Sequence, residues 1–436
     1  MQHDIESVPW SPSHVDCVTA EDMLNDPHAD IQGIHWEHTL NMSREEYHHQ
    51  RKLAYSNYAS MDGSPASNPP RNKMHVDRSL QLVQFNHAYL AHPRPWFPHF
   101  QLRHLVHAPS RHAWFYSTAH QIHQLHPVDH HCSIMLDFEF HGSVEQVAYR
   151  PLLISSFGVN QDLCFVGGYH GDAALVRLDH LDPDINCTGV NACLKQDQVH
   201  YGWVTQHWNG ITNHVSLVYG RHGLGVWVCS NDRYVRYLDP ETFAAHSTYA
   251  ATDTGVCKPH RAFYTSWSPN ASALCPYGRM LGIVGDDLAA ILVDAERGET
   301  LMTLTGHEDY SFACAFSPNG HLFATGNQDQ TCLVYDLRHT TSWLYRFETD
   351  MSAVRSLKFM TNGKYLVCTE AADYVHILEL ASGLEREQTI ELIGEISGTA
   401  VVEDSNDIVV GVLDRGIGGG VFHWVDTSYH HHAFLD

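Results

Sequence analysis

One short pattern recurs along the chain and constrains its fold more than any other feature. An apolar, strand-like segment closes on an acidic residue, and this happens six times between residues 174 and 426. The closing acids are Asp179, Asp239, Asp294, Asp336, Glu379 and Asp426, with separations of 60, 55, 42, 43 and 47 residues. A regular spacing in this range indicates a chain built from repeated structural units, and the later spacings lie on or near about 40–45 residues.

The interiors of the later repeats contain hairpin signals. Phe316–Gly320 and Phe359–Lys364 each end an apolar run in an Asn-Gly turn, and Trp267–Asn270 is assigned to the same place in the preceding repeat. Asn-Gly turns between alternating apolar residues are strong hairpin signals. With a weaker first copy near Phe100–Asp129, the chain has seven units. We therefore predict an all-β fold, a seven-bladed β-propeller over residues 80–436.

Residues 1–79 form an arm with a different composition. It contains acidic stretches and a Pro/Ser/Asn/Gly segment at Asp62–Pro70, so most of it is predicted to be disordered. Ser43 followed by Glu46 is a capping-box pattern, which predicts a short helix over residues 43–55. This helix could pack on the edge of the main domain or serve as a docking peptide for another protein. A strand near Leu80–Phe85 is expected to close the ring by pairing with the last blade, because exposed sheet edges must be covered.

Composition excludes several functional classes. The 436 residues include 26 Lys and Arg against 50 Asp and Glu, a net charge of −24. Such an acidic surface repels phosphate backbones, so nucleic acid is not an expected partner. No apolar run approaches the roughly 18 residues of a membrane span, and the N-terminus lacks the features of a signal peptide. Eleven cysteines without a CxxC pair are typical of buried thiols in a cytoplasmic or nuclear protein.

The clearest repeat runs from Gly306-His307 to Tyr335-Asp336 and resembles a repeat of the WD-repeat β-propeller family. The 27 residues from Glu308 to Val334 match the usual length of that repeat's core. The family pattern implies a hydrogen-bonded tetrad in this blade, formed by His307, Thr325, Asp329 and Tyr335. Tyr335 stands where the family usually has Trp, so its hydroxyl would have to replace an indole N–H.

The arm also carries a resemblance. The segment from Glu45 to Tyr58, with a strand expected at Phe100–Val106, is similar to a little-characterised WD-repeat subgroup found in fungi and plants. The family implies a non-catalytic scaffold that binds other proteins through the loop faces of the propeller. No catalytic or phosphate-binding motif is present, so neither an enzyme activity nor a cofactor is predicted. The acidic surface predicts partners with basic segments.

Two alternatives remain open. Tyr335-Asp336-Leu337-Arg338 resembles the box by which some WD-repeat proteins dock on the adaptor of a cullin-RING ubiquitin ligase. Asp336 and Arg338 are therefore candidate docking residues for a substrate receptor, with Arg338 offering planar hydrogen bonding. The same residues also suit an ordinary strand edge.

The second alternative is a metal-dependent propeller enzyme that uses a histidine-rich segment: His120, His123, His126, His130 and His131, with Asp129. Such side chains are suitable metal ligands, but a spacing of three along a strand alternates between faces, so no metal site is predicted. Gly416–Gly420 precedes a strand at Val421–Val425 and is interpreted as a flexible hairpin turn rather than a phosphate loop.

Overall fold

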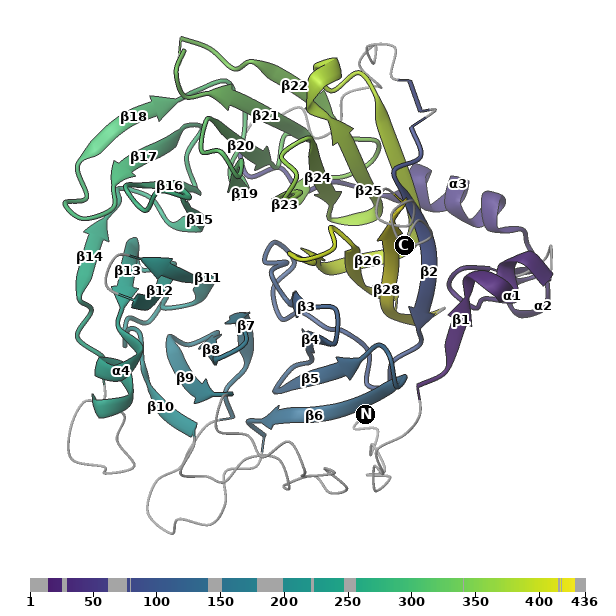
Figure 1. Ribbon diagram of the computed structural model, residues 1–436, viewed down its shortest axis with the longest axis horizontal. Helices are drawn as coiled ribbons and strands as arrows, with labels where there is room; N and C mark the ends of the chain where they lie inside the picture. Colours follow the sequence, from purple (N-terminus) through teal and green to yellow (C-terminus); the bar gives the residue numbers. More distant parts are fainter. Residues whose placement is uncertain are drawn as a thin grey trace, which may run out of the picture.

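The chain folds into a ring of β-sheet blades around a central axis (Figure 1). The computed structural model describes residues 15–25, 30–61, 77–78, 80–139, 151–178, 199–220, 223–246, 256–339, 341–414, 416 and 418–427. Within these residues the strands form five four-stranded antiparallel sheets and one eight-stranded sheet. The closing acid Asp179 and the segment Asp62–Pro70 lie outside them.

The five four-stranded blades follow one another along the chain. Blade one has β3 (Val106–Ser110), β4 (Ala113–Ser117), β5 (Gln121–His126) and β6 (His131–Asp137). Blade two has β7 (Ile154–Val159), β8 (Leu163–Gly168), β9 (Asp172–Arg177) and β10 (Val199–Trp203). Blade three has β11 (Thr212–Gly220), β12 (Gly223–Ser230), β13 (Tyr234–Leu238) and β14 (Arg261–Tyr264). Blade four has β15 (Pro269–Leu274), β16 (Met280–Gly285), β17 (Ala290–Asp294) and β18 (Thr300–Leu304). Blade five has β19 (Ser311–Phe316), β20 (Leu322–Asn327), β21 (Thr331–Asp336) and β22 (Tyr345–Glu348).

The eight-stranded sheet is two blades joined by one long strand. Its strands are β1 (Cys17–Thr19), β2 (Val83–Tyr89), β23 (Val354–Phe359), β24 (Tyr365–Glu370), β25 (Ala372–Glu379), β26 (Glu387–Val401), β27 (Ile408–Asp414) and β28 (Gly418–Asp426). The first part of β26 pairs with β25 as the outer strand of blade six, and its second part pairs with β27 as the inner strand of blade seven. The described strands therefore make the seven-bladed propeller that the repeat spacing predicts.

The ring is closed by the N-terminal part of the chain. β2 pairs antiparallel with β28, from Val83 opposite Asp426 to Tyr89 opposite Val421. This confirms the expected closure, and β1 adds one further strand outside β2. Large aromatic side chains fill the space within and between the blades: Trp114, Phe157, Phe165, Trp227, Phe323 and Phe422 are all buried.

The arm lies against the ring rather than away from it. The sequence predicts disorder for most of residues 1–79, whereas residues 15–25 and 30–61 form β1, α1 (Ala20–Asn25), α2 (Trp36–Leu40), α3 (Arg44–Ala54) and an extended tail. In Figure 1 the purple helices lie outside β2, at the edge of blades six and seven. The remaining helices are α4 (Pro240–His246) and the short 3₁₀ turn η2 (Leu380–Ser382). No helix among the described residues is long and apolar enough to cross a membrane.

One of the three hairpin assignments differs from the structure. The turns at Phe316–Gly320 and Phe359–Lys364 do join the first and second strands of blades five and six. Trp267–Asn270, in contrast, lies at the start of β15, and the equivalent turn of blade four is Cys275–Gly278. The prediction was wrong because Ser268-Pro269-Asn270 has the same residues as the turn Ser317-Pro318-Asn319 of blade five.

Two further segments also differ. Phe100–Leu105 is a loop, and only Val106 begins the predicted strand. Gly418–Gly420 are not a flexible turn, because they form the first residues of β28, paired with β27. A Cβ at Gly419 would collide with the Val412 carbonyl oxygen, and one at Gly420 with the Tyr89 carbonyl oxygen. The glycines are therefore explained by close backbone approach at the ring closure.

Candidate partner-binding face

The structure brings the predicted tetrad residues of blade five together. His307 Nδ1 lies 3.1 Å from Asp329 Oδ2, and His307 Nε2 lies 2.8 Å from Thr325 Oγ1. Thr331, which the sequence analysis did not include, adds a hydroxyl donor 2.6 Å from Asp329 Oδ1. Burial opposes ionisation of Asp329, but the hydrogen bonds from His307 and Thr331 lower its pKa below the usual range. This network fixes the loop before β19 to the turn before β21.

Tyr335 takes a different role from the indole it replaces. Its hydroxyl donates to the Thr305 carbonyl oxygen at 3.2 Å. Burial, partly offset by the Thr325 hydroxyl, raises the pKa of Tyr335 to about 12. The phenol therefore holds the strand that leads to His307 rather than bonding His307 itself.

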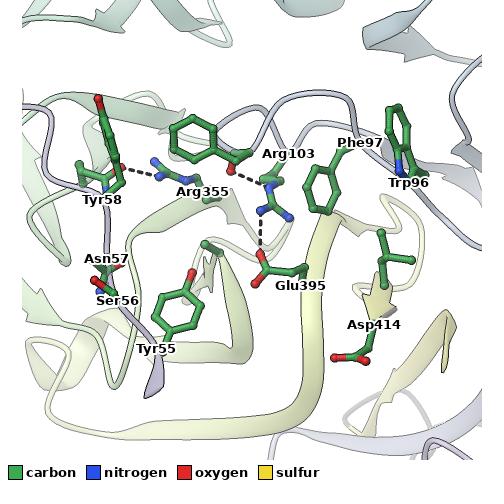
Figure 2. A pocket seen from close by; sticks show the side chains of 14 residues that line it. Tyr55, Ser56, Asn57, Tyr58, Trp96, Phe97, Arg103, Arg355, Glu395 and Asp414 are labelled. Carbon is green, nitrogen blue, oxygen red and sulfur yellow. Dashed lines mark hydrogen bonds and ion pairs between the residues drawn. The ribbon is translucent and has the colours of Figure 1, made fainter. Parts of the chain in front are cut away.

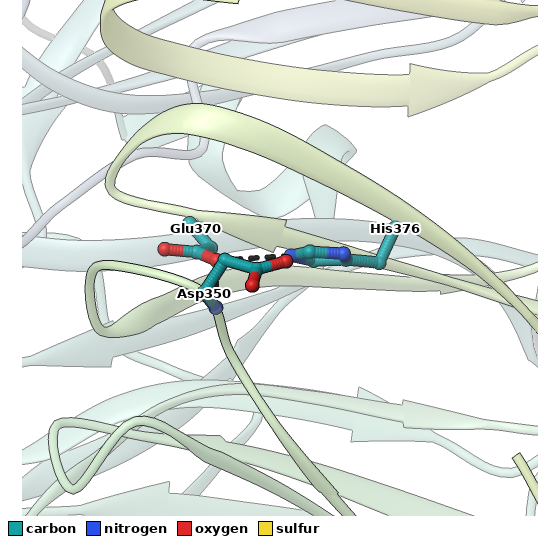
Figure 3. A group of neighbouring side chains, drawn as sticks. All are labelled: Asp350, Glu370 and His376. Atoms are coloured by element: carbon teal, nitrogen blue, oxygen red, sulfur yellow. Dashed lines mark hydrogen bonds and ion pairs between the residues drawn. The ribbon is translucent and has the colours of Figure 1, made fainter. Parts of the chain in front are cut away.

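Blade six contains a second buried network that the sequence analysis missed. His376 Nε2 lies 2.9 Å from Glu370 Oε1, and both side chains are fully buried (Figure 3). The Glu370 carboxylate accepts hydrogen bonds from the backbone N–H groups of Asp350, Met351 and Ser352. It thereby fixes the loop before β23, as Asp329 fixes the loop before β19. No Gly-His pair marks this blade, so the family pattern could not reveal the network.

Asp350, Glu370 and His376 also form a group whose possible metal-ligand atoms lie within 4.8 Å of one another. Donors already fill the positions that a cation would take. Arg78 Nη2 lies 2.8 Å from Asp350 Oδ2, and Glu370 accepts the N–H bonds described above. The arrangement therefore fits a hydrogen-bonded structural network better than a metal centre.

The blades define two faces of the ring. We call one the entry face: it carries the connections from the outermost strand of one blade to the innermost strand of the next, such as residues 90–105 and 349–353. The opposite face carries the turns between first and second strands, such as residues 275–279. Both buried networks hold loops of the entry face in place.

A cavity of about 510 Å³ opens on the entry face (Figure 2). Three parts of the chain line it: the arm, the loop between β2 and β3, and the loops and inner strands of blades five to seven. The lining residues are Tyr55, Ser56, Asn57, Tyr58, Trp96, Phe97, Phe100, Arg103, Gln328, Arg355, Ala371, Glu395, Leu413 and Asp414. Its volume falls within the range of about 300–1,000 Å³ that is typical of ligand pockets.

The arm is held at this cavity by specific contacts. Arg51 of α3 places Nε 2.8 and 2.7 Å from the two carboxylate oxygens of Asp373. Beyond α3, the Asn57 side chain donates to the Met351 carbonyl oxygen at 2.8 Å and accepts from Ala353 N at 3.0 Å. Burial raises the pKa of Asp373 to about 6, while Arg51 and the Gly394 N–H oppose that rise. Residues 55–61 therefore form a strap across the entry face.

The candidate docking residues lie on the other side of the ring. Asp336 ends β21, and the Arg338 guanidinium binds its carboxylate through Nε–Oδ1 at 2.9 Å and Nη2–Oδ2 at 2.7 Å. The Arg338 side chain is 60% exposed. Because β21 starts at the entry face, its end places this pair on the opposite face.

The histidine-rich segment of blade one forms a hairpin without a common centre. His123 on β5 is buried and stacks on Tyr116, with ring centroids 5.0 Å apart. His126 and His131 face each other across the hairpin at 6.1 Å, and His120 Nδ1 lies 2.9 Å from the Leu152 carbonyl oxygen. Among the described residues, these imidazoles do not form a group with metal-ligand spacing.

Comparison with known proteins agrees with this architecture. The family model described as "WD domain, G-beta repeat" matches residues 298–336, the part of the chain that contains His307, Asp329 and Tyr335. A chain of the crystal structure of the mitotic checkpoint complex superimposes with a TM-score of 0.56 and 14% identity, covering 86% of this chain and 99% of that one. At this identity the likeness shows the fold alone.

Two curated relatives match shorter stretches. The small ribosomal subunit protein RACK1y of Oryza sativa subsp. japonica is 38% identical over 81 residues, 19% of this chain and 23% of the relative. The nuclear distribution protein PAC1 of Arthroderma benhamiae is 28% identical over 137 residues, 26% of this chain and 29% of the relative. The chain thus spans about a quarter of the length of the relatives it matches.

The seven antiparallel blades and the His–Asp network of blade five define a β-propeller built from WD-type repeats. Residues 298–336 match a WD repeat, and this match with the two relatives supports a WD-repeat family for the chain. Its resemblance to a fungal and plant subgroup stays a prediction.

Proposed function

We propose that this protein is a non-catalytic scaffold whose partner proteins bind the entry face of the propeller. The observation that carries the proposal is the cavity on that face, which combines aromatic walls with charged groups. Aromatic side chains with a few placed polar groups are typical of recognition sites. The two buried networks hold the surrounding loops rigid, which reduces the ordering cost of binding.

Exposed aromatic side chains border the cavity. Tyr58 of the strap is 56% exposed and packs edge-on against Phe100, which is 47% exposed, with ring centroids 5.3 Å apart. Large exposed aromatic groups of this kind contribute most of the binding energy in many interfaces. Tyr58 and Phe100 are therefore the residues expected to contact a partner directly.

The test is quantitative affinity capture from the native cell with a double variant, Tyr58→Ala with Phe100→Ala. Partners that bind the entry face should fall at least tenfold relative to the unchanged chain. The matched control is Tyr277→Ala, which removes an aromatic group that is 65% exposed on the opposite face. Cross-links from captured partners should map to the strap and to residues 90–105. If the partners still bind the double variant but are lost with Tyr277→Ala, they bind the opposite face and the proposal is contradicted.

The net charge of −24 favours partners whose basic segments lie on the acidic surface around the cavity. The acids next to the arm are already paired with its arginines. Arg51 pairs with Asp373, and Arg78 pairs with Asp350 and Glu387. We expect the association rate with such partners to fall as salt rises. The cytoplasm or the nucleus is the proposed location, where the free thiols of the chain are stable.

A second candidate function is that of a substrate receptor of a cullin-RING ubiquitin ligase. The exposure of Arg338 on the opposite face supports it, whereas its paired hydrogen bonds with Asp336 suit a structural strand end equally well. Arg338→Ala in the same capture experiment separates the two. Selective loss of a ligase adaptor supports the receptor, and an unchanged partner set contradicts it.

A further inference from the structure

Arg355 is a buried cation without a counter-charge. It lies on β23, it is only 3% exposed, and it lines the cavity of the entry face. Nη2 donates to Gln328 Oε1, and the guanidinium lies 4.3 Å from the centre of the Phe312 ring. Nε and Nη1 have no hydrogen-bond partner, and among the described residues no carboxylate lies within ion-pair distance of Arg355.

The neighbouring Arg103 lines the same cavity, but each of its three guanidinium nitrogens has a hydrogen-bond partner. It is equally buried, but Nη2 lies 2.8 Å from Glu395 Oε2, Nη1 donates to the Ile396 carbonyl oxygen and Nε to that of Phe100. Its guanidinium also covers the Phe97 ring at 3.5 Å. Figure 2 shows both guanidinium groups between Tyr58 and Phe97, with Glu395 on the side of Arg103.

The carboxylates around the cavity are therefore engaged by arginines other than Arg355. Arg103 is paired with Glu395, and Asp414 lies 3.4 Å from Arg51 Nη1. Arg51 also pairs with Asp373, so the three arginines around the cavity face three carboxylates. None of these carboxylates contacts Arg355, and its Nε and Nη1 therefore have no acceptor. Burial and the nearby Arg103 lower the pKa of Arg355 to about 9, so the guanidinium is still protonated at neutral pH. Buried N–H groups of a charged side chain that lack an acceptor destabilise a fold, which indicates that something outside the described residues completes the site.

We propose that a carboxylate of a partner peptide binds in this cavity and pairs with Arg355. This inference rests on the proposed function and names the chemical group that the entry face recognises. The two N–H groups of Arg355 that have no acceptor suit a carboxylate, whereas a phosphate dianion would bring a second negative charge close to Glu395 and Asp414. The aromatic walls formed by Tyr55, Trp96 and Phe97 accept an apolar or aromatic neighbour of the acid. Either an acidic side chain or a C-terminal carboxylate offers this chemistry.

The test measures thermal stability of the full chain with small probes at constant ionic strength. N-acetylphenylalanine represents a terminal carboxylate, and N-acetyl-aspartyl-phenylalaninamide represents an acidic side chain. Each is compared with its neutral counterpart, N-acetylphenylalaninamide and N-acetyl-asparaginyl-phenylalaninamide, and inorganic phosphate is the third arm. At about ten times its Kd, a binding probe should raise Tm by about 1.5 °C, and the neutral counterparts should not. The probe with the larger shift identifies the source of the carboxylate.

Arg355→Met supplies the second readout, with Arg338→Met as the matched control on the opposite face. The probe-dependent shift should vanish in Arg355→Met and persist in Arg338→Met. Without probe, Arg355→Met should be as stable as the unchanged chain or more stable, because it removes buried N–H groups that lack an acceptor. The proposal is overturned if carboxylate and amide probes act alike, if phosphate stabilises more, or if Arg355→Met lowers Tm markedly without probe.

The probe experiment and the partner-capture experiment can fail independently of each other. If partner capture depends on Tyr58 and Phe100 but neither carboxylate probe stabilises the chain, the scaffold stands and the carboxylate is wrong. If a carboxylate probe acts through Arg355 while capture ignores those aromatic groups, the cavity binds a small acid and the entry face is not the protein interface.

Discussion

At the scale of single residues, the propeller depends on buried carboxylates that hold loops. Asp329 accepts hydrogen bonds from His307, from the Glu308 N–H and from both the N–H and the hydroxyl of Thr331. Asp329→Ala leaves these donors buried without an acceptor, so we expect the free energy of unfolding to fall by about 3 kcal/mol. Urea unfolding measures the loss. Glu299→Ala, which removes an exposed carboxylate between β17 and β18, is the control and should cost much less; equal losses would contradict the role given to Asp329.

The same scale shows where sequence reasoning stops. His307, Thr325 and Asp329 could be named because their spacing follows the repeat pattern of the family. Glu370 and His376 could not, because they perform a similar task with a different residue order. Nothing in the sequence distinguishes Arg355 from any polar residue of an alternating strand. Only the three-dimensional contacts show that its Nε and Nη1 have no hydrogen-bond partner.

At the scale of elements, α3 is the part of the arm whose attachment can be tested. Ser43 accepts from the Glu46 N–H at 3.1 Å, and the Glu46 carboxylate accepts from the Ser43 N–H at 3.0 Å. Ser43→Ala should destabilise the docked helix by about 1 kcal/mol and speed amide exchange in α3 about fivefold. Exchange in β2 should not change. Thr39→Ala on the exposed side of α2 is the control, and faster exchange throughout the ring would show that the effect is not local.

At this scale, a periodic pattern in the sequence predicts some features of the strands and not others. Strand order, hairpins and ring closure follow from alternation and spacing, since these are repeated in each blade. The boundaries at Phe100–Leu105 and Gly418–Gly420 do not follow, because a loop that carries apolar side chains resembles a strand and packed glycines resemble a turn. The packing of the arm could not be predicted either, because single ion pairs such as Arg51–Asp373 do not recur along the sequence.

At the scale of the whole molecule, the many histidines make stability depend on pH. Burial lowers the pKa values of His104, His107 and His123 to about 4, 3 and 3. His104 and His107 lie close together beside Lys358, whereas His123 lies on β5. The folded state therefore keeps them neutral at pH 5.5, whereas the unfolded chain protonates them near the ordinary pKa of about 6.5. Because the unfolded state binds more protons, stability is present above pH 6.5 and is lost as the pH falls towards 4.

The histidines and Asp373 change the stability in opposite directions as the pH falls, and the histidine contribution is larger. Between pH 7.5 and 5.5 the three imidazoles should together remove about 4 kcal/mol, while Asp373, whose pKa burial raises to about 6, should return about 1 kcal/mol as it takes up its proton. We therefore expect the free energy of unfolding to fall by at least about 3 kcal/mol over this range, measured by urea denaturation at constant ionic strength. His214, whose pKa burial also lowers, adds to the loss. His123→Phe should remove about a third of the imidazole contribution, whereas exposed His112→Gln is the matched control. A flat profile, or one that His123→Phe leaves unchanged, would show that these buried imidazoles do not control the response.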